Sequence, residues 1–367
     1  MEQERLRQFD WTLILITLAI IAMGVLNLYS ATFREAISSG GMTYYKSQMI
    51  WFGLGAVLAA IVLAFHYKLL SRYGYLIYFG NLLLLVLVLV AGKASLGGRR
   101  WIGFGGFRMQ PSEFMKLAAV IAMAKYFEND RTTGGYRLRD IWLPATMILV
   151  PAALIMMQPD LGTAMILILT FASLMLFIRI DRKSLLILAA TCVIAMPIAY
   201  KYGLKDYQRQ RLVTFVNPMS DPKGSGYNSI QSMIAIGGGK FLGKGFKKGT
   251  QSQLNFLPEH HTDFVFAVFS EEHGFLGALV LLALFALLFL TGLNIAYVSH
   301  DKFGTLLALG ILTIFFWHVV INIGMVCGIL PIVGVPLPFM SYGGSSLITS
   351  LLGIAILTNI SNKRFMF

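Results

Sequence analysis

The chain has 367 residues, of which 57% are hydrophobic and only 13% are charged, whereas soluble globular proteins carry roughly 25% charged residues. This composition excludes an ordinary soluble domain and predicts an integral membrane protein. The formal net charge is +13, but most basic residues flank apolar runs, a pattern typical of membrane topology signals and not of nucleic acid binding.

Ten apolar runs are long enough to span a bilayer. Roughly 20 helical residues cross a hydrocarbon core of about 30 Å, and a helix satisfies its own backbone hydrogen bonds in lipid. We predict spans at 11–31, 45–66, 69–91, 112–128, 142–157, 161–179, 184–201, 264–294, 303–327 and 341–361. The first run lacks a cleavage signature and is expected to be a retained helix. The sequence therefore predicts an all-α, polytopic membrane protein with a single domain over residues 1–367.

The basic residues of the short loops predict the orientation of these spans. With a cytoplasmic N-terminus, fourteen Lys and Arg residues lie on the cytoplasmic side and six lie in short outer loops, as the positive-inside rule requires. The long loop 201–263 is then extracytoplasmic, with nine basic and four acidic residues. This excess of positive charge predicts an anionic ligand, and attraction of a solvated loop to anionic lipids is the alternative.

Charged residues gather where the predicted 112–128 span begins. The segment GGRRWI, which contains Arg100, precedes QPSEFMK, in which Pro111 suits a first helical turn. Glu113 and Lys116 are spaced i, i+3 and share a helix face. Charges at the edge of a span usually pair or line a cavity, so a structural ion pair and a polar substrate cavity are both open and compatible interpretations.

The segment QPDLGT forms the predicted outer turn between two spans. Asp160 can cap the helix that follows it, or it can face the same outer cavity as Arg99 and Glu113. Within the long loop, Gly238, Gly243 and Lys244 nearly match a phosphate-binding loop, but a glycine follows the lysine where Ser or Thr should bind magnesium. We therefore reject nucleotide binding, although glycines beside lysines can approach a pyrophosphate through backbone N–H groups.

The long loop ends in LPEHHTDF, which enters the next apolar span. An acid at this boundary is partly desolvated, which raises the pKa of a carboxyl group toward values useful for a general base. The paired histidines lack the spacing of a zinc site. A divalent cation, Mg²⁺ or Mn²⁺, held by Asp263 together with a lipid pyrophosphate remains open.

Prolines and paired glycines interrupt the apolar segment GVPLPFMSYGGSS. Irregular backbone at membrane depth is tolerated where it lines a cavity. Ser341, Ser345 and Ser346 offer hydroxyl groups near a helix N-terminus, which favours anions, and a re-entrant turn with capping serines is the alternative. All these clusters fall on the predicted outer side, which indicates one outward-facing polar cavity.

Six motifs in this order, GGRRWI, QPSEFMK, QPDLGTA, RLVTFVNP, FLPEHHTDFVFAVFSEEHGFLG and GVPLPFMSYGGSS, resemble the SEDS family of shape, elongation, division and sporulation proteins. The resemblance covers nearly the whole chain and is strongest to the elongation member, with the division member close behind. It implies a peptidoglycan glycosyltransferase of the bacterial inner (plasma) membrane with an extracytoplasmic active face.

The same resemblance implies a substrate, a partner and residue roles. The substrate is lipid II, polymerised by inverting transfer into β-1,4 glycan strands with release of undecaprenyl pyrophosphate, and the partner is a class B penicillin-binding protein. Asp263 matches the catalytic acid of the family. The expected substrate-binding residues are Glu113, Lys116, Asp160, Arg100, Arg211, Lys244, Ser341 and Ser346. A lipid II flippase, a scaffold that only recruits the crosslinking partner, and a division polymerase are the alternatives.

Overall fold

A computed structural model describes residues 10–33, 44–95, 98–104, 107–129, 135–203, 205–222, 224–254 and 256–363. Six of the basic residues counted in the topology prediction lie outside these ranges, as does the first glycine of the GGRRWI motif: Arg5, Arg7, Arg34, Arg131, Lys223, Arg364 and Gly97. The charges that these residues add to the topology prediction are therefore not described by the structure.

Ten long helices correspond one to one with the predicted spans. They are α2 (Trp11–Ala31), α4 (Tyr44–Ala64), α5 (Lys68–Ala91), α6 (Pro111–Glu128), α7 (Leu138–Met157), α8 (Leu161–Phe177), α9 (Arg182–Ile198), α13 (Val265–Val298), α14 (Lys302–Val326) and α15 (Gly344–Lys363). Among the described residues, seven of these helices are long and apolar enough to cross a membrane, and α8 is a shorter apolar helix. The prediction of a helical, multi-spanning membrane protein is confirmed.

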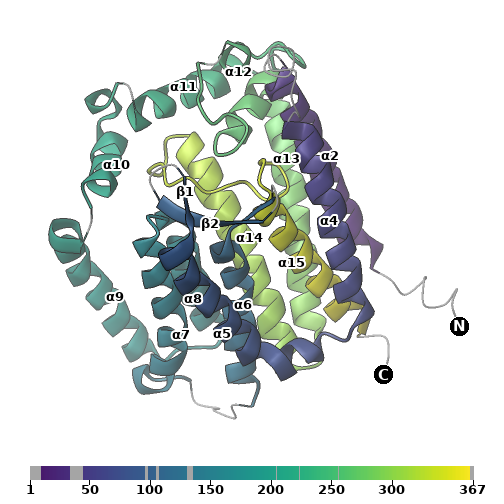
Figure 1. Cartoon of the computed structure of the whole chain (residues 1–367), viewed down its shortest axis with the longest axis vertical. Coiled ribbons are helices and arrows are strands. Elements are labelled where there is room, and N and C mark those ends of the chain that lie inside the picture. The colour runs from purple at the N-terminus through teal and green to yellow at the C-terminus, as the bar shows by residue number, and fades with distance from the viewer. Residues whose placement is uncertain are drawn as a thin grey trace, which may run out of the picture.

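Two groups of short elements were not predicted. The first is a small antiparallel sheet of β1 (Lys93–Ser95), β2 (Gly98–Phe104) and β3 (Phe107–Met109), in that order. The second divides the long loop into η1 (Ala199–Gly203), α10 (Asp206–Val216), η2 (Pro218–Ser220), α11 (Ser225–Gly238) and α12 (Thr250–Gln253). Helices α11 and α12 lie across one end of the bundle, and α10 lies to the side near the same end (Figure 1). Elements this short leave too little periodicity to be recognised.

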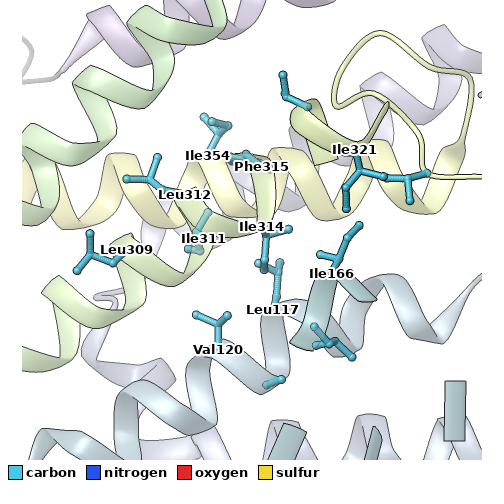
Figure 2. Packing of buried hydrophobic residues seen from close by; sticks show 14 of the residues in the cluster. Leu117, Val120, Ile166, Leu309, Ile311, Leu312, Ile314, Phe315, Ile321 and Ile354 are labelled. Carbon is cyan, nitrogen blue, oxygen red and sulfur yellow. The ribbon is translucent and has the colours of Figure 1, made fainter. Parts of the chain in front are cut away.

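The core of the bundle lies around α14. Its side chains meet α6 and α8 on one side and α15 on another, as Leu117, Ile166, Leu312 and Ile354 illustrate (Figure 2). Helix α6 is buried along almost its whole length. By contrast, peripheral helices such as α5 and α9 expose large apolar side chains, for example Leu186. Because an apolar outer surface is stable in lipid, this arrangement fits a bundle embedded in a bilayer.

Helix α13 contains a break at Gly274, whose φ of 65° and ψ of −164° are not helical. The glycine-rich end of the long loop docks into this break through reciprocal backbone hydrogen bonds. The N–H of Phe275 donates to the carbonyl of Lys240 at 2.9 Å, and the N–H of Lys244 donates to the carbonyl of Glu271 at 2.9 Å. The predicted span 264–294 is therefore two segments, of which the first is buried and carries the acids Glu271 and Glu272 near its end.

The opposite end of the bundle carries its own buried polar contacts. The Nδ2 of Asn359 donates to the carbonyls of Val62 at 3.0 Å and Phe65 at 2.5 Å. Ser361 donates to Asp10, which joins the end of α15 to the start of α2. In Figure 1, the ends of α2 and α15 that carry these contacts lie at the opposite end of the bundle from α11 and α12. Variants at these positions can therefore serve as controls for variants at the candidate site.

Candidate active site

Asp263 lies in the turn directly before α13, and the backbone of this turn is held by the C-terminal third of the chain. Three consecutive carbonyls each accept one hydrogen bond: His261 from the N–H of Tyr342 at 2.9 Å, Thr262 from the Oγ of Ser341 at 2.7 Å, and Asp263 from the Nδ2 of Asn322 at 2.9 Å. Backbone groups with paired partners hold their place. The position of the Asp263 side chain is therefore determined by segments some sixty to eighty residues away.

Burial, together with the negative charges of Glu259 and Asp160, raises the pKa of Asp263 to about 6, and the positive charges of Arg211 and Arg100 partly oppose this rise. Desolvation disfavours the charged form of a carboxyl group, which is the effect expected from the sequence. The charged groups that act on Asp263 include three of the predicted site residues, Arg100, Asp160 and Arg211. The structure therefore brings these three predicted residues close to the candidate base.

Asp160 caps α8 and also joins that helix to the start of α6. Its Oδ1 accepts from the N–H of Thr163 at 3.2 Å, and its Oδ2 accepts from the Nε2 of Gln110 at 2.8 Å. Arg100, on β2, donates from Nε to the carbonyl of Gln158 at 2.9 Å and from Nη2 to the carbonyl of Pro159. The interpretation of Asp160 as a helix cap is confirmed, and the turn 158–160 lies beside Arg100 of β2.

Glu113 and Lys116 form the ion pair that their spacing predicts. The Nζ of Lys116 lies 2.9 Å from the Oε2 of Glu113 and 2.7 Å from the Nε2 of His318. Lys116 is 1% exposed and Glu113 is 4% exposed. The pair is therefore an internal network, and a direct role in binding substrate stays a prediction.

The predicted interruption lies between α14 and α15 and contains no helix in residues 327–343. Ser341 uses its hydroxyl internally, since it accepts from the N–H of Leu337 at 2.8 Å and donates to Thr262. Ser345 accepts from the N–H of Gln110 at 2.9 Å. Ser346 lies partly buried in the first turn of α15, and its contact with a substrate stays a prediction.

Lys244 has a different environment from the other candidates. Its Nζ donates to Glu271 Oε1 at 2.6 Å and to the hydroxyl of Thr250 at 2.8 Å. Glu271 is fully buried and also accepts from the N–H of Thr250 at 2.8 Å. The N–H groups of Lys244 and Gly245 donate to carbonyls of α13, so these two N–H groups are used inside the protein. Substrate binding by Lys244 stays a prediction.

Sequence reasoning missed Gln110, His318 and Asn322 as members of this network. His318 and Asn322 are polar residues inside the apolar helix α14, 3% and 0% exposed. An intramembrane polar residue is a functional candidate by default, and two of them at i, i+4 share a face. This spacing in the sequence is the signal that could have found them.

A divalent cation beside Asp263 would need several oxygen or nitrogen ligands close together. Within the described parts of the chain, no three His, Cys, Asp or Glu side chains gather closely enough to hold a metal ion. Asp263 and its neighbours therefore do not form a metal site by themselves, and a cation would need ligands from the substrate. The Mg²⁺ or Mn²⁺ suggested above stays a prediction, and no step below depends on it.

An apolar helical bundle with a desolvated carboxyl group at one end defines an integral membrane protein with a candidate acid–base site. A family model described as a cell cycle protein family, which groups FtsW, RodA and SpoVE, matches residues 10–365. The match covers nearly the whole chain, and the chain belongs to this family. The resemblance to SEDS proteins seen in the six motifs is thereby confirmed.

Similar proteins extend this result over nearly their full lengths. The chain is 39% identical over 357 residues to the peptidoglycan glycosyltransferase MrdB of Escherichia coli K12, covering 97% of this chain and 94% of MrdB. It is 38% identical over 364 residues to a probable peptidoglycan glycosyltransferase FtsW of Trichlorobacter lovleyi, with the same coverage of 97% and 94%.

Solved structures show the same fold. One chain, from work on how a peptidoglycan synthase complex coordinates polymerization and crosslinking, superposes with a TM-score of 0.83 at 33% identity, covering 98% of this chain and 99% of that chain. The rod shape determining protein RodA of Thermus thermophilus superposes with a TM-score of 0.72 at 29% identity, covering 97% and 98%.

Proposed function

We propose that this protein is a peptidoglycan glycosyltransferase that polymerises lipid II into β-1,4 glycan strands for cell elongation. The single observation that carries the proposal is the desolvated carboxyl group of Asp263, which lies among Arg100, Arg211 and Asp160 in a chain of this family. A carboxyl group with a pKa of about 6 is ionised at neutral pH and is still basic enough to accept a proton in a transition state.

In this proposal Asp263 accepts the proton of the acceptor sugar's 4-hydroxyl while that oxygen attacks the anomeric carbon of the donor sugar. The bond from this carbon to the pyrophosphate oxygen breaks, and the configuration at the carbon inverts from α to β. The leaving undecaprenyl pyrophosphate carries the negative charge. Arg100 and Arg211 lie within electrostatic reach of Asp263, so their guanidinium groups can stabilise the charge that develops on the leaving group.

The proposal also assigns a membrane and a partner. We infer that the protein lies in the bacterial inner membrane with Asp263 on the extracytoplasmic face, because the short-loop charges favour that orientation. A class B penicillin-binding protein is the proposed partner. The similar chain from a peptidoglycan synthase complex, whose work concerns coordinated polymerization and crosslinking, supports such an assembly.

The proposal is tested with the purified full-length protein, alone and together with its crosslinking partner, incubated with lipid II. We expect glycan strands, detected by gel separation after labelling, and a matching release of undecaprenyl pyrophosphate. In parallel, lipid II is placed in one leaflet of proteoliposomes to measure its transfer. Transfer without any polymer would support the flippase alternative, and neither product would leave the scaffold alternative.

The polymerisation rate is expected to depend on pH through Asp263. The ionised carboxylate is the active form, so the rate should fall about tenfold per pH unit as the pH drops below about 6. Arg211→Gln removes a positive charge that lowers this pKa, so the midpoint should move to higher pH. Glu259→Gln removes a negative charge that raises it, so the midpoint should move to lower pH. Measuring kcat/KM from pH 5 to pH 9 tests this, and shifts of both variants in the same direction would contradict it.

Gly334 is expected to be required for the geometry of the base. Its φ is +74°, and a Cβ added there would lie 3.2 Å from the Oδ2 of Asp263. Gly334→Ala should therefore strain the backbone by about 1–2 kcal/mol and displace the carboxylate, lowering kcat by at least about tenfold. Gly328→Ala is the matched control, because Gly328 has a φ of +73° and its added Cβ would meet Met233. Equal kcat values for the two variants would show that strain alone explains the loss.

A further inference from the structure

Two buried polar residues on α14, His318 and Asn322, bind the same short stretch of backbone. The Nδ1 of His318 lies 3.0 Å from the carbonyl oxygen of Pro336, and the Nδ2 of Asn322 donates to the carbonyl of Val335 at 2.7 Å. The two residues are one helical turn apart and share a face. Helix α14 therefore holds this stretch with two adjacent side chains, at the centre of the bundle.

Each of these side chains also contacts a residue of the candidate site. The Nδ2 of Asn322 donates to the backbone carbonyl of Asp263 at 2.9 Å, and the Nε2 of His318 lies 2.7 Å from the Nζ of Lys116. A carbonyl oxygen only accepts, so the Nδ1 of His318 carries the proton. The neutral ring then presents the Nε2 lone pair to the ammonium of Lys116, and the two contacts of His318 are mutually consistent.

The Val335–Pro336 stretch beside Asp263 depends on side-chain donors from α14, because its own sequence offers few free backbone N–H groups for hydrogen bonds. Pro336 and Pro338 have no N–H group, and the N–H of Leu337 donates to the hydroxyl of Ser341. Val335 is 1% exposed and Pro336 is partly buried, and a buried carbonyl without a hydrogen-bond partner is costly. Gly334, the residue before this stretch, faces the Oδ2 of Asp263. A shift of the Val335–Pro336 stretch would therefore also move Gly334, which lies beside the carboxylate of Asp263.

We propose that His318 and Asn322, whose side chains share the Val335–Pro336 backbone as a partner, are positioning residues for the reaction. Asn322 sets the place of Asp263, and His318 holds the ammonium of Lys116 beside Glu113. This proposal rests on the proposed function, in which Asp263 is the base. Neither His318 nor Asn322 touches the reacting atoms in this account, so both act through other residues.

The first experiment replaces Asn322 by Leu, which has a similar size and no donor. We expect kcat for lipid II polymerisation to fall about 10- to 100-fold, with KM changed by less than about twofold, because the base is misplaced while the substrate still binds. Asn359→Leu is the matched control, since Asn359 is also buried and also donates to two carbonyls. If both variants lose the same stability and the same kcat, Asn322 is only structural and the proposal is overturned.

The second experiment separates the two contacts of His318. His318→Gln places an amide near the Nε2 position and keeps a contact with Lys116, whereas His318→Asn places an amide near the Nδ1 position and keeps the bond to Pro336. We expect His318→Gln to retain more kcat than His318→Asn. We also expect Lys116→Met to cost little further kcat when added to His318→Leu, because the two residues act as one unit. The reverse order of Gln and Asn, or fully additive losses, would overturn the role of His318.

The failures of the two proposals can be told apart by including Asp263→Asn in the same assays. If the wild type polymerises lipid II, Asp263→Asn is inactive and Asn322→Leu keeps the wild-type kcat, only the positioning proposal fails. If Asp263→Asn keeps the wild-type kcat, Asp263 is not the base and both proposals fall. Folding of each variant is checked by its thermal unfolding in detergent, so that loss of protein is not read as loss of kcat.

Discussion

Asp263→Asn is expected to lower the rate of lipid II polymerisation by about 10²–10⁴-fold, the usual contribution of a positioned general base. Asparagine has nearly the same shape, and the backbone bonds that hold this turn do not involve the side chain. The fold should therefore survive. The measurement is the initial rate of glycan formation by the purified protein with its crosslinking partner, at a pH at least one unit above 6, where Asp263 is ionised.

Stability provides an independent check on the same variant. The folded state raises the pKa of Asp263 above its ordinary value, so above pH 6 the folded protein carries an ionised group that burial disfavours. Removing this charge should leave the thermal unfolding temperature at neutral pH unchanged or slightly raised. As pH falls below the ordinary pKa of an Asp side chain, the difference between the two proteins should disappear.

A second acid of the same loop is the control for Asp263→Asn. Asp221 accepts from the N–H of Ser225 at 2.9 Å at the start of α11, and nothing places it near the proposed reaction. Asp221→Asn should keep the polymerisation rate within about twofold. An Asp263→Asn variant that is as active as Asp221→Asn would remove Asp263 from the proposed mechanism.

Lys116→Met is expected to destabilise the protein by about 3–5 kcal/mol, because it leaves the carboxylate of Glu113 buried without its cation. The two side chains are 1% and 4% exposed, so water cannot replace the lost partner. Changing Glu113 to Leu as well should recover most of the lost stability, since neither charge then remains buried. The measurement is unfolding of the single and double variants in the same detergent.

The exposed pair Arg209 and Asp206 is the comparison for this experiment. Its closest atoms are 3.9 Å apart, the Asp206 side chain is fully exposed and the Arg209 side chain is 37% exposed, and such a surface ion pair contributes little. Arg209→Met should change the unfolding temperature far less than Lys116→Met. If the double variant at Lys116 and Glu113 is as unstable as the sum of its single variants, the pair does not act through mutual neutralisation.

The sequence by itself was sufficient for the class of protein and for ten helices. Apolar runs about twenty residues long have one stable solution in lipid, the helix, so their number and approximate bounds can be read directly. The predicted span 264–294 was over-long and carried Glu271 and Glu272 in its early part, but the break at Gly274 was found only in the structure. The helix cap at Asp160 could also be predicted, because it is a local feature: Asp160 and Thr163 are three residues apart and one hydrogen bond joins them.

The small sheet and the loop helices were not readable from the sequence. Strands of three to seven residues and helices of four to fourteen residues carry little periodic signal. Their stability comes from packing on the bundle, as with the turn around Lys244, which is held by the buried carboxylate of Glu271. The glycines around Lys244 did not show whether it lies near the substrate, because these glycines allow the loop backbone to pack closely against α13.

The arrangement of the site was decided by the tertiary structure alone. The predicted span bounds put Asp263, Asp160 and the residues around Ser341 on the same predicted side of the membrane, but they could not show that Ser341 and Asn322 hold the backbone of Asp263. These bonds join residues 59 and 79 positions apart. The composition of the chain determines that it folds in a membrane, because the free energy of burying apolar surface is additive along the sequence. The position of the Asp263 carboxylate depends on contacts that exist only once the helices have packed.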